Sequence, residues 1–211
     1  MDRLLPTLDE LVATRRASGG DAETMCLAAL RGRLSELSAR GASGTLTTAI
    51  AIVREAQEQA EPVAWIALAG APMFYPPDAA ATGIDLAALA VVRAPDLDAA
   101  ARAAEGLLRS GAFGLVVLDL ASAGDRAKIS AAHLGRMITL AQTHDAAVLC
   151  ITAKPADAPS VGSLISLRAE ALRLVEPGQP GRFSVRVRVL KDKRRGPGAQ
   201  RLLKVRGPDG Y

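Results

Sequence analysis

Short apolar runs that alternate with helical segments restrict the fold of this chain more than any other feature. Each run suits one buried strand, and together they lie at residues 63–68, 88–92, 115–120 and 147–151. Helix-forming stretches separate them, for example residues 96–108, which Asp96 should cap, and 129–144. Farther on, Phe183, Val185, Val187 and Val189 alternate with polar residues, which predicts a half-exposed strand. We therefore expect an α/β domain with a doubly wound, mainly parallel sheet and antiparallel C-terminal strands.

The length and the scattered cysteines narrow the class of protein. The 211 residues suffice for one domain with a full core. No apolar run approaches the roughly 20 residues that a membrane span needs, and the N-terminal residues lack the apolar core of a secretory signal. Cys26 and Cys150 lie far apart in the sequence, and each has apolar neighbours, so we expect buried thiols rather than a disulfide or a metal site. These features predict a cytoplasmic protein without a membrane partner.

The charge is concentrated near the C-terminus. Residues 182–206 contain ten Lys or Arg and one Asp, a net charge of +9, whereas the whole chain carries +4. A basic end on an otherwise mildly acidic domain predicts an anionic partner, and nucleic acid is the first candidate.

Residues 31–48 read as a strand, a Gly/Ser-rich loop and the start of a helix, which is where a phosphate-binding P-loop would lie. A working P-loop has the pattern G-x-x-x-x-G-K-[ST]. Here Ala39 replaces the first Gly, whereas Gly44 matches the second and is what the strand-to-helix turn needs sterically. Thr45 and Leu46 stand where the Lys and the metal-binding hydroxyl are needed. The loop thus lacks the two side chains that hold phosphates and Mg²⁺.

Three segments together resemble the core of RecA-like proteins. GRLSEL at 32–37 is similar to the approach to the RecA P-loop, and residues 95–123 are similar to its helix and Walker B strand. VRVRVLKDKRR at 185–195 resembles the RecA strand that ends in K-x-K. The resemblance implies a RecA-like core over residues 28–206, preceded by an N-terminal docking or oligomerisation helix within residues 1–20 and followed by a short tail, 207–211. It also implies a degenerate nucleotide site, which would comprise Arg40, Gly44, Thr45, Thr47 and Asp119.

The departures from the family pattern argue against catalysis. No carboxylate follows the run at 63–68, where the family has its water-activating Glu, and Thr152-Ala153 replaces its Asn-Gln pair. Phosphoryl transfer needs these groups together. We therefore expect no ATP or Mg²⁺ cofactor, no enzyme activity, and Asp119 as a carboxylate that binds local amides. Arg40 is the residue that could still contact a phosphate, and a weak DNA-dependent ATPase is the alternative.

A RecA-like chain with a degenerate ATP site resembles the ImuA family of accessory proteins in SOS mutagenesis and translesion synthesis. The resemblance implies a nucleoid-associated role in the DNA-damage response with a polymerase-like partner of the ImuB type, with RecA, or with both. A cell-division inhibitor of the SulA type is the second choice.

Two surfaces could carry such contacts. By analogy with RecA protomers, a partner or a second copy of the chain would add a strand to the edge formed by Ala88, Leu89, Ala90, Val91 and Val92; the alternative is that the chain's own loops cover this edge. The basic residues Lys191, Lys193, Arg194 and Arg195 would contact a partner or single-stranded DNA without sequence preference; the alternative is a solvated tail.

Overall fold

The computed structural model describes residues 24–175 and 182–206. The helix expected within residues 1–20 and the tail at 207–211 lie outside the described residues. In the described part, no helix has both the length and the apolar character needed to cross a membrane.

One mixed sheet of eight strands organises the described chain, in the order β3-β2-β4-β5-β1-β6-β7-β8. The neighbours from β3 to β6 pair in parallel, and β7 and β8 continue the sheet antiparallel. The strands are β1 (Arg33–Ser38), β2 (Val63–Leu68), β3 (Leu89–Ala94), β4 (Leu115–Asp119), β5 (Ala147–Thr152), β6 (Leu167–Val175), β7 (Arg182–Asp192) and β8 (Gln200–Arg206). The predicted α/β class, mainly parallel with antiparallel C-terminal strands, is confirmed.

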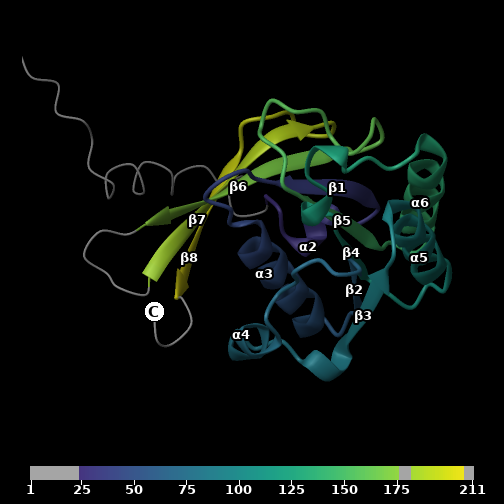
Figure 1. The fold of residues 1–211 in the computed structure, drawn as a ribbon, viewed down its shortest axis with the longest axis horizontal. Coiled ribbons are helices and arrows are strands. Elements are labelled where there is room, and N and C mark those ends of the chain that lie inside the picture. Colours follow the sequence, from purple (N-terminus) through teal and green to yellow (C-terminus); the bar gives the residue numbers. More distant parts are fainter. Residues whose placement is uncertain (1–23, 176–181, 207–211) are drawn as a thin grey trace, which may run out of the picture.

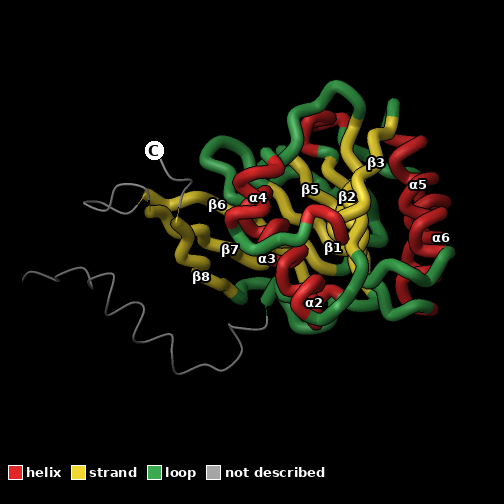
Figure 2. The backbone as a smooth tube through the Cα atoms, turned by 90° about the horizontal axis from the view of Figure 1, so that it is seen from below, coloured by secondary structure: helices red, strands yellow, loops and turns green. Residues whose placement is uncertain are grey.

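Helices pack on both faces of this sheet (Figures 1 and 2). The helices are α2 (Leu27–Leu30), α3 (Thr45–Glu58), α4 (Pro76–Ala81), α5 (Leu97–Arg109) and α6 (Ala131–Thr143), with 3-10 turns η1 (Leu86–Ala88) and η2 (Ala121–Arg126). Residues of α2, α3 and α4 share one apolar cluster, and residues of α5 and α6 share the other. We call these two sides of the sheet the α3 face and the α5 face.

The alternation of side chains along each strand divides the core between these faces. Trp65 of β2 lies in the α3-face cluster and its neighbour Ile66 in the α5-face cluster, both fully buried. Helix starts follow the expected capping chemistry: Asp96 accepts a hydrogen bond from the Ala99 amide at 2.7 Å. The sequence prediction of a capped helix after Asp96 is therefore confirmed.

Two local predictions need correction. β3 begins at Leu89 and runs to Ala94, because Ala88 ends the 3-10 turn η1, whose Asp85 carboxylate accepts a hydrogen bond from the Ala87 amide. Ala88 is therefore not part of the edge strand. Cys150 is buried as expected, but Cys26 is only half-buried, at the start of α2.

Candidate functional site

The loop at residues 39–44 leaves the carboxyl end of β1 and enters α3. In α/β sheets, ligands bind at the carboxyl ends of the parallel strands, so a phosphate site would be expected in this loop. The strand, loop and helix expected from the sequence are all present, with α3 beginning at Thr45. The loop differs from a P-loop in the hydrogen-bond partners of its backbone and hydroxyl groups.

Backbone hydrogen bonds join the loop to β6, the strand at which the antiparallel part of the sheet begins. The Gly44 amide donates to the Ala171 carbonyl of β6 at 2.9 Å, and the Arg173 amide donates to the Ala42 carbonyl at 2.8 Å. A Cβ on Gly44 would overlap the Val185 side chain of β7. Gly44 has φ −112°, so the glycine is required by close packing and not by a left-handed backbone.

The hydroxyls at the start of α3 are also engaged within the loop. Thr45 is buried, and its Oγ1 lies 2.9 Å from the Ser43 hydroxyl. The Thr48 hydroxyl donates to the Gly44 carbonyl at 2.9 Å, whereas Thr47 lies half-exposed one residue earlier. The groups at the helix N-terminus therefore bind one another and β6, an arrangement that stabilises the turn itself.

Arg40, the one cation of the loop, is exposed and pairs with Asp125 of η2 at 2.5 Å. Through this pair the loop after β1 contacts the turn that follows Asp119. Screening by water makes such an exposed ion pair weak, at about 0.2–1 kcal/mol. An anion could therefore compete for Arg40 at modest cost.

Asp119 ends β4 and is buried. Burial raises the pKa of its carboxyl; a hydrogen bond from the Ala121 amide at 3.3 Å and the charge of Arg93 act in the opposite direction. The Trp65 indole also favours the ionised form, although its N–H does not reach good hydrogen-bonding geometry. The observed contact is of the kind expected for a carboxylate that binds local amides.

A buried charge network at β1 was not expected from the sequence. Glu36 has no exposed surface; it accepts hydrogen bonds from the Thr152 hydroxyl at 2.9 Å and the Val161 amide at 3.0 Å, with Arg168 at 3.8 Å. Arg168 in turn donates to the Pro155 carbonyl at 2.8 Å. The network holds residues 155–161 against β1 and β6. Glu36, an acidic residue within an expected strand, was the feature of the sequence that could have indicated this network.

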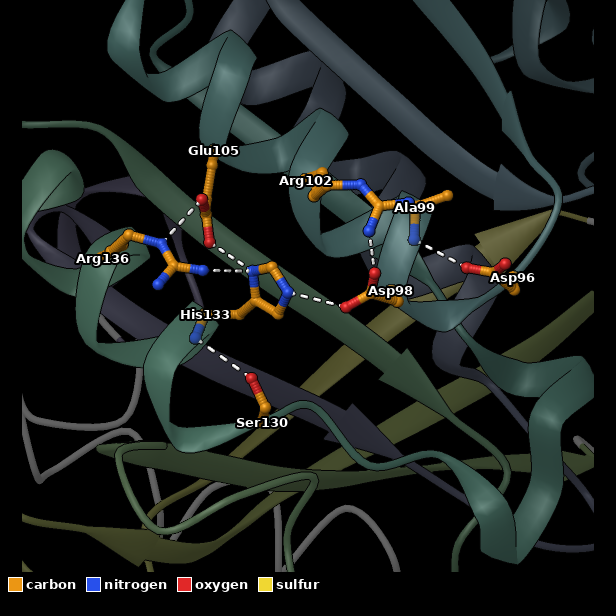
Figure 3. Close-up of polar contacts among 8 residues, drawn as sticks. All are labelled: Asp96, Asp98, Ala99, Arg102, Glu105, Ser130, His133 and Arg136. Carbon is orange, nitrogen blue, oxygen red and sulfur yellow. Dashed lines mark hydrogen bonds and ion pairs between the residues drawn. The ribbon is translucent and has the colours of Figure 1, made fainter.

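A second polar cluster that the sequence did not predict joins α5 and α6 (Figure 3). The ring nitrogens of His133 lie 2.5 Å from Glu105 Oε1 and 2.8 Å from Asp98 Oδ1. Arg136 donates to the other Glu105 oxygen at 2.9 Å. Burial would raise the pKa of Glu105, but hydrogen bonds from Arg136 and His133 outweigh it and hold that pKa below its usual value. The acids lie seven residues apart, a helical spacing that could have indicated this face.

β3 forms one edge of the described sheet, with β2 on its inner side. Val91 is 45% exposed, and Ala90 is exposed as well, whereas Leu89 and Ala94 are buried. Within the described residues no strand pairs with the outer side of β3.

The four basic residues expected at the C-terminal surface separate into two groups. A register shift opposite Arg168 and Ala169 reorients the end of β7, so Lys191 lies half-buried beside Arg168. Burial, and then the charge of Lys193, lower the pKa of Lys191. Lys193, Arg194 and Arg195 are exposed in the turn before β8, where Lys193 donates to the Ser163 carbonyl at 3.1 Å.

No protein-family model matches the chain, and no curated protein matches it either.

Proposed function

We propose that this chain is a non-catalytic, RecA-like accessory protein of the DNA-damage response, of the ImuA type, that acts through protein contacts in translesion synthesis. The observation that supports this proposal most is the loop after β1, where Gly44 and Thr45 are bound to β6 and to the loop itself. Phosphoryl transfer needs free loop amides, a lysine and a metal-binding hydroxyl at this position. The loop offers Thr45 and Leu46 there instead.

The edge strand β3 is the proposed docking surface for a polymerase-like partner or RecA. Its outer backbone groups suit the addition of one strand from the partner, and Val91 offers an exposed apolar side chain. β3 carries a single cation, Arg93, whose guanidinium is directed to the Ala71 carbonyl at 3.0 Å. Natural sheets place charged side chains on edge strands that must not pair with another chain, and β3 has little of this protection.

Affinity purification of the full chain from DNA-damaged cells tests the partner. The variant Val91→Lys adds a charge to the edge, and Val175→Lys makes the same change at a valine that is 80% exposed on β6. We expect the wild type and Val175→Lys to recover a polymerase-like protein or RecA, identified by mass spectrometry. The amount of this partner recovered with Val91→Lys should be at least ten-fold lower. Equal recovery with all three proteins contradicts the docking surface.

Nucleotide binding and turnover test the absence of catalysis. The purified chain should show no ATP turnover above that of its Asp119→Ala variant, with and without single-stranded DNA. Turnover that disappears in Asp119→Ala would overturn the proposal in favour of a weak DNA-dependent ATPase.

A further inference from the structure

The ribbon formed by β6, β7 and β8 has one face on which no described helix is seen to pack. α3 contacts β6 and β7 from the α3 face, while α5 packs against β2, β3 and β4, and α6 against β1 and β5. The free ends of β7 and β8 project away from the helices (Figure 1). The α5 face of this ribbon is therefore covered by no described helix, and residues 155–161 cover it only around Arg168 of β6.

Cations dominate this face. Val185, Val187 and Val189 point into the α3-face core, so Arg182, Arg186 and Arg188 of β7 lie on the opposite side, and all three are exposed. The register pairs Ser184 with Lys204, which places the exposed Lys204 on the same side. Arg186 and Arg188 are two residues apart, and Arg182 lies four residues before Arg186, with the buried Ser184 between them.

Few carboxylates compensate these charges. Glu170 of β6 lies opposite Arg188 and pairs with it at 2.9 Å. Asp192 is buried in a pair with Arg33 at 2.6 Å and faces away from the surface row. Among the described residues, no carboxylate forms an ion pair with Arg186 or Lys204.

The register shift at the end of β7 extends the row rather than ending it. Beyond the shift, Lys191 opposes Arg168, which lies on the α5 side of β6, and Lys193 reaches the carbonyl of Ser163. The cations at 182, 186, 188 and 191 thus follow one face of β7 over roughly 30 Å, at the usual rise of a strand, and Lys193 continues the row in the turn that follows. Burial lowers the pKa of Lys191 most, and the nearby charge of Lys193 lowers it further. A bound anion would relieve the repulsion between these two cations.

We propose that this row binds the phosphodiester backbone of single-stranded nucleic acid, laid along β7. A single file of cations fits a linear polyanion better than the compact acidic patch of a folded protein. One guanidinium group can bind two phosphate oxygens at once, which suits Arg182 and Arg186, whereas Arg188 already pairs with Glu170. The exposed Leu202 lies beside Arg186 and offers only apolar contact to bases, so binding has no sequence preference and depends strongly on salt.

This surface lies at the opposite end of the sheet from β3, so either proposal can fail alone. The test is fluorescence anisotropy of a labelled 20-nucleotide oligo(dT) with the full chain over a series of salt concentrations. The ribbon variant carries Arg186→Gln and Lys204→Gln. The control variant carries Arg54→Gln and Arg109→Gln, which remove the same charge from exposed positions on α3 and α5.

We expect the ribbon variant to bind oligo(dT) at least ten-fold more weakly at low salt, with a salt slope reduced by about 1.4 for two lost phosphate contacts. The control variant should change by less than two-fold, and thermal unfolding should show that both variants are folded. Oligo(U) should bind as oligo(dT) does, since the backbone is what is recognised.

Absence of oligo(dT) binding at low salt, or equal losses in both variants, overturns the proposal. Poly-L-glutamate of the same charge is the competitor that tests the other class of partner. If it displaces oligo(dT) as well as unlabelled oligo(dT) does, the row recognises acidic polymers generally and the assignment to nucleic acid is wrong.

Discussion

β3 and β8 form the two ends of the same sheet, yet their chemistry is opposite. β3 (LAVVRA) contains one cation, whereas β8 (QRLLKVR) contains three and is paired with a strand, β7, rich in arginine. Charges on an edge strand discourage pairing with other strands. The comparison suggests that one end of the sheet suits backbone pairing with a protein and the other suits a polyanion, with the parallel core between them.

The two ends also differ in how they are attached to the core. β2 and β3 are held by apolar packing, with Trp65 against Phe74 at 5.0 Å between ring centroids. The antiparallel end is held in part by polar contacts, including the Arg33–Asp192 pair and the Gly44–Ala171 hydrogen bond. Variants that weaken one attachment and spare the other can test this difference.

The largest effect should come from the Arg33–Asp192 pair, which is almost fully buried and joins β1 to the end of β7. Asp192→Ala leaves the Arg33 charge buried without its partner, and should lower the free energy of unfolding by about 3–5 kcal/mol in urea denaturation. Glu58→Ala, which breaks the exposed Arg54–Glu58 pair, should cost about 0.3–0.5 kcal/mol. A similar loss in both variants would contradict a structural role for the buried pair.

Gly44→Ala should have the next largest effect. The new Cβ overlaps Val185, so we expect a loss of about 2–3 kcal/mol in thermal or urea unfolding. Val185→Ala combined with Gly44→Ala should recover part of that loss because it removes the overlap. Gly106→Ala, at an exposed position of α5 with open space around it, should instead raise stability by about 1 kcal/mol. If Gly44→Ala is neutral, the loop does not depend on close contact with β7.

The polar cluster between α5 and α6 should make the free energy of unfolding depend on pH. The folded pKa of Glu105 lies below the ordinary value of 4.5, so its contribution is complete above that pH and is lost as the pH falls through the folded pKa. Glu105→Gln should cost about 1.5 kcal/mol at neutral pH and flatten this acid-side loss, as followed by urea titrations at each pH. Asp98→Asn, whose carboxylate is more exposed, is the control and should cost less.

Val91→Lys should change stability least, by less than about 0.5 kcal/mol, because this side chain is 45% exposed. That small effect is what makes it a clean probe of the edge: loss of partner binding with unchanged urea unfolding would locate the contact at β3. A marked loss of stability would contradict this prediction, because Val91 would then be needed for the fold.

Sequence reasoning identified the elements that depend on local pattern. Apolar runs in β2, β4 and β5, the Asp96 cap of α5 and the alternation at Val185, Val187 and Val189 all appear in the structure. Each depends on near neighbours in the chain, where side-chain period and hydrogen-bond chemistry act directly. The concentration of cations in residues 182–206 was likewise visible from the sequence.

Contacts between distant segments could not be predicted in this way. The sequence indicated that Gly44 serves the turn, but its neighbour is Val185, 141 positions along the chain. Lys191 was expected on the surface, and one register shift in β7 moved it beside Arg168. Glu36 became a buried acceptor only because β5 and residues 155–161 supply its donors.

The sequence by itself therefore determined which segments become strands and helices, and which end of the chain is basic, because both follow from local composition and period. The tertiary structure alone decided which strands are edges, which cations share a face and which loop groups are already hydrogen-bonded. These properties depend on strand order and register, which are set by packing between segments far apart in the chain.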